Sequence, residues 1–255
     1  MDSEEQEIAV TEEVEVGPSA ADYSRGRWDG SDVTEAEIEW LYRSRHIPAG
    51  VACRIPKDEL MPVPEPGEVI VFTAHFARGL GLPVSDFFRS FLDFYELQQH
   101  HLPANAVFIL SSFAAFCEGY VGLWPSLKLW AQLYTLRINS IQDPTVPLPK
   151  PIVQCGACIV VPRQKSPHMK MAGLESCQKW QRTFFYVKNT GATDLINLPA
   201  YVAGEPSRVN WLYNPQQSHK ETNRIFDYIV GLQEDHEPTA DDIVRTFITR
   251  RVLPL

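Results

Sequence analysis

Apolar and aromatic residues are densest between Pro64 and Trp130, where their spacing predicts short helices separated by proline and glycine. From Ser85 to Leu97 the apolar positions follow i, i+4, i+7 and i+1, i+5, i+8 spacings, which wraps an apolar stripe around more than half of a helix. Ser85 suits the N-cap of this helix, because its hydroxyl can accept a hydrogen bond from a free backbone N–H. A helix of this kind is buried on several sides, so the stretch is the predicted core.

Two more helices are predicted in the same stretch. The first follows Pro103, and its charge-free run from Leu102 to Cys117 is 16 residues long. A bilayer crossing needs about 20 apolar residues, so we interpret this run as a buried core helix and expect no membrane association. The second begins near Pro125 and is expected to place six apolar residues inward. They are Leu127, Leu129, Trp130, Leu133, Tyr134 and Ile138.

Upstream of the core, Thr34 and Glu37 have the spacing of a capping box, in which each side chain bonds the other residue's backbone N–H. They predict a helix that runs to about Arg45. The segment from Pro56 to Pro66 is interpreted as an extended linker packed on the surface, because proline interrupts regular structure.

Downstream, four prolines between Asp143 and Pro151 predict a loop. The β-branched and aromatic runs at 152–161 and 182–188 predict two strands, which we expect to be antiparallel neighbours. Helical spacing predicts two more helices at 221–232 and 239–250. The predicted fold class is α+β, mainly α-helical, with a helical front half, a small antiparallel β element and C-terminal helices. The predicted division is an acidic disordered tail (1–27), a helical core block (28–142) and a mixed α/β part packed on the same domain (143–255).

Composition agrees with a folded protein that has a charged end. The 255 residues are 44% hydrophobic and can bury a sizeable core. The net charge is −9, and residues 1–16 hold seven acids and no base, which predicts a solvated tail and a nearly neutral remainder. The first residues lack the basic start and the apolar run of a secretory signal peptide. The chain has five cysteines, an odd number that cannot all pair in disulfides. We therefore expect reduced thiols and an intracellular protein, nuclear or cytoplasmic, that is not secreted.

Several motifs together resemble one family. They occur in order as PGEVIVFTAHFARGLGLPVSDFFRSFLDFYELQ, HLPANAVFILSSFAAFCEGYVGLWPSLKLW, KWQRTFFYVKN, INLPAYV and RRVLPL. This pattern is similar to the plant family of gypsy-type transposon proteins, over roughly Trp28 to the end of the chain. The resemblance implies a gag-like or accessory protein of a retroelement, and it brings no catalytic residues with it.

The polymerases and aspartic proteases of retroelements depend on catalytic aspartates that stand in recognisable sequence motifs. The adjacent Asp241 and Asp242 stand at a helix start, where capping explains them better than two-metal catalysis does. An aspartic protease requires Asp-Thr-Gly, and the nearest match, at 189–191, has asparagine in place of the acid. Phosphate-loop, GxSxG and HExxH motifs do not occur. We therefore predict no enzyme, no catalytic residue, no cofactor and no small-molecule substrate.

The CxxC pair of Cys155 and Cys158 is a candidate metal site. His168 and Cys177 follow it and would complete four ligands, which is the number that zinc takes. The spacings match no common zinc motif, and we place the pair on a strand rather than in a turn. His100 and His101 are interpreted as residues at a helix end, where the dipole tolerates imidazole. We predict no metal, and Cys53, Cys117 and Cys177 as small buried hydrophobes.

The segment from Arg163 to Lys188 is a candidate nucleic-acid site. This segment carries six basic residues and one acidic residue, interleaved with aromatic residues. Basic side chains attract phosphates, and exposed aromatic rings stack on the nucleobases of single strands. In the alternative interpretation, the aromatic rings face the core and the basic side chains face solvent. The candidate residues are Arg163, Lys165, Lys170, Lys179, Trp180, Arg182 and Lys188.

Two functional hypotheses follow. The first is a non-enzymatic gag-like structural or protein-interaction domain, with self-association as the expected partnership. The second is a nucleic-acid-associated accessory protein that binds RNA or single-stranded DNA through the 163–188 segment. The low overall pI of about 5.3 favours the first, because autonomous nucleic-acid binders are usually basic.

Overall fold

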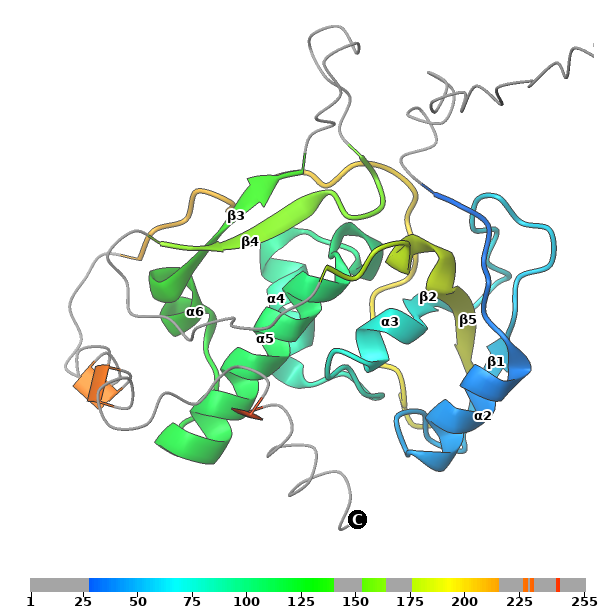
Figure 1. Ribbon diagram of the computed structural model, residues 1–255, viewed down its shortest axis with the longest axis horizontal. Coiled ribbons are helices and arrows are strands. Elements are labelled where there is room, and N and C mark those ends of the chain that lie inside the picture. Colours follow the sequence, from blue (N-terminus) through cyan, green and yellow to red (C-terminus); the bar gives the residue numbers. More distant parts are fainter. Residues whose placement is uncertain are drawn as a thin grey trace, which may run out of the picture.

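The computed structural model describes residues 28–139, 153–163, 176–215, 227, 228, 230, 231, 242 and 243. It is a mixed α+β fold with small antiparallel sheets (Figure 1). The helical elements are α2 (Glu35–Arg43), α3 (Thr73–Phe76), α4 (Asp86–Tyr95), η1 (Gln99–His101), α5 (Ala104–Phe116), η2 (Cys117–Val121), α6 (Leu127–Leu133) and η3 (Trp180–Thr183). The strands are β1 (Val51–Arg54), β2 (Glu68–Phe72), β3 (Tyr134–Ile138), β4 (Cys158–Pro162) and β5 (Phe184–Asn189).

The predicted helix starts are confirmed by their caps. Thr34 and Glu37 form the capping box at the start of α2. Ser85 accepts a hydrogen bond from the Phe88 N–H at the start of α4. These caps were predictable because each one depends only on residues three positions apart.

Helix α5 lies in the middle of the molecule (Figure 1). Ten of its 13 residues are buried, which explains its apolar composition on every side. Within the described part of the chain, the helical run Ala104–Val121 alone has the length and apolar composition to cross a membrane, and more than half of it is buried inside the protein. The burial agrees with the prediction of a core helix.

Strand β5 lies at the centre of a three-stranded antiparallel sheet of order β1-β5-β2. Phe184 and Tyr186 pack in a small apolar cluster with Trp28 and Trp180, whereas Phe185 and Val187 pack in the main core. Successive side chains of a strand point to opposite faces, so β5 places side chains in two cores and is buried at four successive positions.

Two predictions about the strands are wrong. The helical front half stays a prediction, and strands β1, β2 and β3 lie within it besides the helices. The predicted third helix ends at Leu133, and Tyr134 to Ile138 form β3, which pairs antiparallel with β4. The two predicted strands are confirmed at β4 and β5, but they belong to different sheets and are not neighbours. Pairing with distant segments decided these elements over local spacing.

The main core contains residues from the front of the chain, such as Leu41, and from the back, such as Val160 and Trp211. The domain boundaries at 27 and 142 nevertheless stay predictions, as does the helical predominance of the whole chain. The acidic tail lies outside the described residues. Of the two predicted C-terminal helices, only Asp227, Tyr228, Val230, Gly231, Asp242 and Ile243 are described, and these six are helical.

Candidate interaction surface

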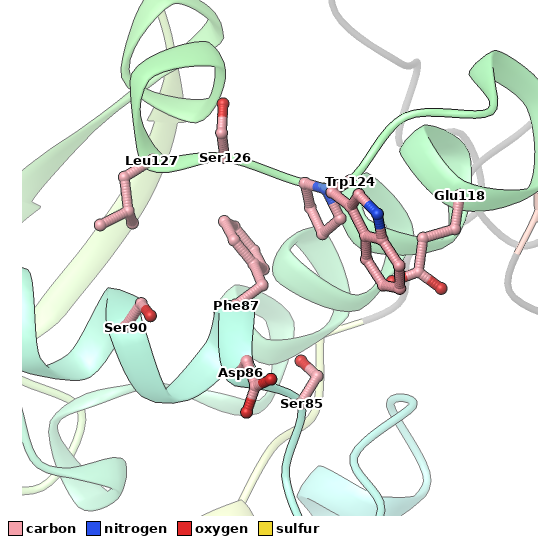
Figure 2. A pocket seen from close by; sticks show the side chains of 9 residues that line it. Ser85, Asp86, Phe87, Ser90, Glu118, Trp124, Ser126 and Leu127 are labelled. Carbon is pink, nitrogen blue, oxygen red and sulfur yellow. The ribbon is translucent and has the colours of Figure 1, made fainter.

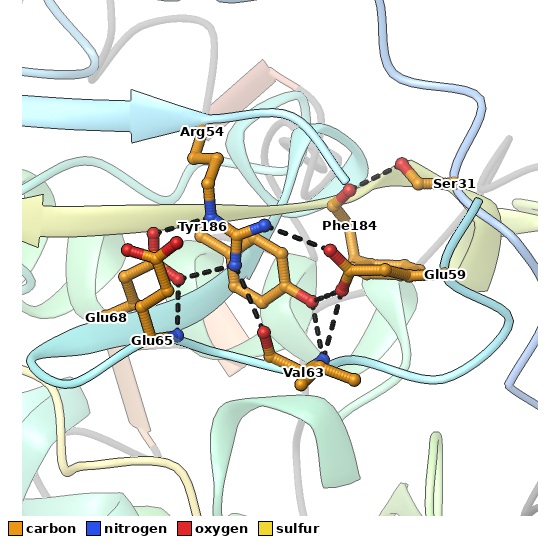
Figure 3. A network of polar contacts seen from close by, with 8 residues as sticks. All are labelled: Ser31, Arg54, Glu59, Val63, Glu65, Glu68, Phe184 and Tyr186. Carbon is orange, nitrogen blue, oxygen red and sulfur yellow. Dashed lines mark hydrogen bonds and ion pairs between the residues drawn. The ribbon is translucent and has the colours of Figure 1, made fainter. Parts of the chain in front are cut away.

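Arg54, the last residue of β1, is the centre of a network of polar contacts (Figure 3). The sheet register places it directly opposite Tyr186 of β5, so that its guanidinium lies 3.9 Å from the centre of the Tyr186 ring. Its Nε and Nη2 donate to the two carboxylate oxygens of Glu68 at 2.8 and 2.6 Å. Its Nη1 donates to Glu59 at 2.9 Å. One arginine therefore ties two strands to the segment between β1 and β2.

The same network holds the backbone of that segment. The Val63 N–H donates to the Tyr186 hydroxyl at 2.7 Å, and the Val63 carbonyl accepts from Arg54 at 3.1 Å. The Tyr186 hydroxyl donates to Glu59, and the Glu65 N–H donates to Glu68 at 2.7 Å. We call residues 59–65 the braced loop. The predicted linker at 56–66 thus lacks helix and strand, as expected, but it bends at several positions and side chains from the sheet fix it.

The charges of the network stabilise one another. Burial favours a higher pKa for Glu59, but hydrogen bonds from Tyr186 and Arg54 outweigh it, and the pKa is lowered. The hydrogen bond from Arg54 also lowers the pKa of Glu68 despite its burial. Burial, together with the Glu59 carboxylate, raises the pKa of Tyr186. The two glutamates are therefore ionised and the tyrosine is neutral at neutral pH.

The outer side of the braced loop is apolar. Leu60, Met61 and Val63 are 60%, 36% and 67% exposed, whereas Pro62 between them is buried. Single exposed hydrophobic residues are common on proteins, but a group of them on one fixed segment is typical of an interaction site.

A second surface feature is a cavity of about 400 Å³, which we call the Trp124 pocket. In Figure 2 the Trp124 ring and Glu118 lie on one side, Asp86 and Ser85 lie at the start of α4, and Phe87 follows on that helix. Trp124 is 86% exposed and its neighbour Leu123 is 42% exposed. The lining residues are Ser85, Asp86, Phe87, Ser90, Glu118, Trp124, Pro125, Ser126 and Leu127.

Local sequence explains why Trp124 points outward. Element η2 is a π-helical turn that follows α5 directly, and such turns are frequent at functional sites. Gly122 ends it with a φ of 72°, a left-handed conformation that glycine adopts readily. Pro125 and the Ser126 N-cap of α6 follow at once, so Trp124 lies on a short connection between two helices.

Two arginines of the predicted nucleic-acid segment make contacts within the protein. Arg163 donates from Nε to the Ala131 carbonyl at 2.5 Å and from Nη2 to the Tyr213 carbonyl at 2.6 Å. Arg182 forms ion pairs with Asp32 at 2.8 Å and Asp29 at 3.5 Å. Both guanidinium groups therefore already have partners within the protein, which leaves them less available to a nucleic acid.

The other candidates of that segment are divided. Trp180 is buried in the small apolar cluster, and Phe184, Phe185 and Tyr186 are fully buried, so these rings face the interior. Lys179 and Lys188 are exposed, on η3's N-cap and on β5. Lys165 and Lys170 lie outside the described residues. The segment's nucleic-acid role stays a prediction, which now depends on the lysines rather than on aromatic stacking.

The CxxC pair was placed wrongly on a single strand. Cys155 lies in a turn before β4, and Cys158 is the first residue of β4. The Gly156 between them has a φ of 77°, and a Cβ there would lie 3.0 Å from the Trp180 ring, so the backbone conformation and the closeness of the ring both favour glycine. Burial raises the pKa of both thiols. Among the described residues no group of three or more potential ligands could hold a metal ion, and His168 lies outside them.

The histidine pair does lie at a helix end, in η1, but not for the reason expected. His100 and His101 are buried, and so is His75 of α3. Burial lowers the pKa of His75 to about 3 and of His101 to about 4, and it lowers that of His100 as well. His101 accepts from the Gln98 N–H through Nδ1 and contacts the Gly204 carbonyl through Nε2. These imidazoles are neutral, so a charge–dipole interaction does not hold them.

One comparison with known proteins gives a relationship. Residues 69–138 match the family model described as "Putative gypsy type transposon". This segment is thus similar to gypsy-type transposon proteins. The matched segment runs from β2 to the end of β3, so it contains α4, α5, α6 and the described residues that line the Trp124 pocket. The braced loop lies just before it. No curated protein and no solved structure matches the chain.

Proposed function

We propose that the chain is a non-enzymatic, gag-like structural protein of a gypsy-type transposon, whose folded core associates with a second copy of itself. The relationship of residues 69–138 to gypsy-type transposon proteins supports the transposon origin. The buried thiols and imidazoles support a structural role, because burial keeps the thiols protonated, the imidazoles neutral and both away from solvent. They are Cys117, Cys155, Cys158, His75, His100 and His101.

The braced loop is the observation that carries the interaction role. Leu60, Met61 and Val63 expose apolar area that a partner could remove from water. Fixing a segment before it binds lowers the entropy that binding costs, and the contacts of Arg54 and Tyr186 fix this one. A second copy is the proposed partner because a two-fold contact uses the same surface on both subunits, and an apolar segment is complementary to itself.

Sedimentation velocity over a range of protein concentrations tests this proposal. We expect the average mass to rise with concentration toward that of a dimer. Because apolar contacts are screened little by salt, the rise should persist at high ionic strength. A monomer at every concentration, up to about millimolar, would contradict the proposal.

Nucleic-acid association through Arg163–Lys188 is the second candidate function. The exposed Lys179 and Lys188 favour it, whereas the internal contacts of Arg163 and Arg182 weaken it. Fluorescence anisotropy with labelled single-stranded RNA at low and moderate salt tests it. The informative variant is Lys179→Gln with Lys188→Gln, since changing the two arginines would also disturb the fold. Binding that weakens with salt and is lost in this variant would favour the second function.

A further inference from the structure

We propose that the Trp124 pocket binds a lysine or arginine side chain carried by an extended segment of a partner protein. The inference concerns a site separate from the braced loop and does not depend on self-association. It rests on three features of the pocket: an exposed indole ring, two carboxylates that form no ion pair with the described residues, and apolar lining side chains.

The exposed ring is the first feature. Trp124 is 86% exposed, more than any other tryptophan of the chain, and its ring borders the cavity (Figure 2). The face of an indole attracts cations, and among aromatic side chains tryptophan does so best. Pro125 follows directly, and its ring fixes its own φ, which restricts the backbone on one side of Trp124 and limits the entropy lost on binding.

The carboxylates are the second feature. Asp86 and Glu118 line the cavity, and within the part of the chain that the structure describes neither forms an ion pair. Other acids near the surface do have partners, such as Asp93 with Arg89 and Asp32 with Arg182. Among the lining residues that the structure describes, none is basic. A cation from outside would therefore meet two opposite charges and, among these residues, no competing cation.

The helix starts at the pocket do not reverse this preference. Helices α4 and α6 both begin there, and free N–H groups at a helix start attract anions. The Ser85 and Ser126 hydroxyls already accept from the N–H groups of Phe88 and Leu129. An anion would also meet Asp86 in the first turn of α4. The local electrostatics thus favour a cation.

The apolar residues of the pocket favour a charged side chain over a small inorganic ion. Phe87 and Leu127 also line the cavity and supply apolar surface there. Lysine and arginine carry aliphatic stems that pack on such surface while their charged heads reach polar groups. The exposed Leu123 beside the ring can receive an apolar residue next to the cation. The cavity of about 400 Å³ lies within the range of small-ligand sites, enough for side chains but not for a folded domain.

An NMR titration tests the proposal on the full chain. The six tryptophan indole N–H signals are recorded, and Trp124→Phe identifies the signal of Trp124. The probe is a short Gly/Ser peptide with a central Leu-Arg pair, and the matched peptide has Leu-Gln. The background is Leu60→Ser/Met61→Ser/Val63→Ser, so that self-association through the braced loop does not interfere with the measurement.

We expect the Leu-Arg peptide to shift the Trp124 signal saturably, while the Leu-Gln peptide leaves it unchanged. Asp86→Asn with Glu118→Gln should weaken binding about tenfold. Trp124→Ala should abolish binding, which in this variant is read from the backbone amide signals of the other pocket residues because the indole signal is gone. Two control variants outside the pocket, Glu39→Gln and Trp40→Ala, should bind within about twofold of the background protein. The indole signals of the buried tryptophans show in each variant that the fold is intact.

Three results would overturn the inference. They are equal shifts with both peptides, binding that survives Asp86→Asn/Glu118→Gln unchanged, and binding of free arginine amide as tight as that of the peptide. The last would mean a site for a small cation rather than for a protein segment. Because the titration uses the loop variant, its failure leaves the self-association proposal standing, and a monomeric wild-type protein leaves the peptide site standing.

Discussion

At the scale of single residues, Arg54 has the largest number of roles. It pairs with two carboxylates, bonds the Val63 carbonyl and covers the Tyr186 ring. Glu68 is nearly buried, so it depends on this partner for its charge. Arg54 therefore stabilises the fold and fixes the braced loop at the same time.

Replacing Arg54 with glutamine should lower the free energy of unfolding by about 2 kcal/mol, because Glu59 and Glu68 would keep their charge with little compensation. Urea denaturation measures this change. The matched control is Arg89→Gln, which removes an exposed pair with Asp93 and should cost no more than about 0.5 kcal/mol. Equal effects of the two substitutions would contradict the role given to the brace.

The residues of the brace could not be found from the sequence. Arg54, Glu59, Glu68 and Tyr186 have no local spacing in common, and only the sheet register brings them together. Trp124 had a partial signal, since it lies between Gly122 and Pro125, which indicate a loop. Its high exposure still depended on how α5 and α6 pack.

At the scale of elements, helices were predicted better than strands. The starts of α2 and α4 follow from Thr34 and Ser85, whose caps are local. The VIVF run of β2 was missed because a short apolar run fits a buried helix as well as a strand. Strand β3 was assigned to a helix because Leu133, Tyr134 and Ile138 also fit helical spacing. In both cases the partner strand lies far away in the chain and decides the structure.

A disulfide test distinguishes β3 as a strand from the helix that spacing suggests. Arg137 lies directly opposite Ile159 in β4, so cysteines at these two positions face the same side at cross-strand distance. Arg137→Cys/Ile159→Cys should cross-link under mild oxidation, as read by mass spectrometry of the digested protein. The off-register control Arg137→Cys/Val161→Cys should cross-link far less. Efficient cross-linking of the control alone would show that the register is wrong.

At the scale of the whole molecule, three buried histidines make stability depend on pH. Burial holds the folded pKa of His75 at about 3 and of His101 at about 4, below the usual value of 6.5, and that of His100 is lowered too. Below pH 6.5 the unfolded chain thus binds more protons than the folded one, so the free energy of unfolding falls as the pH falls.

Urea denaturation between pH 7 and pH 5 measures this dependence. The expected loss approaches about 1.4 kcal/mol per pH unit for each histidine. The window excludes most of the effect of Glu59 and Glu68, whose lowered pKa values make stability fall only below about pH 4.5. The variant His75→Gln/His101→Gln should show a shallower slope. A stability independent of pH in this range would contradict the buried neutral histidines.

The central claim is that the braced loop joins two copies of the chain, and light scattering of paired variants tests it most directly. Leu60→Ser/Met61→Ser/Val63→Ser removes the apolar side of the loop. The matched control Val202→Ser/Val209→Ser/Leu212→Ser removes three exposed apolar side chains elsewhere. At a concentration where the wild type is mostly dimeric, we expect the loop variant to have the mass of a monomer and the control to keep that of the dimer. A loop variant as dimeric as the wild type would contradict it.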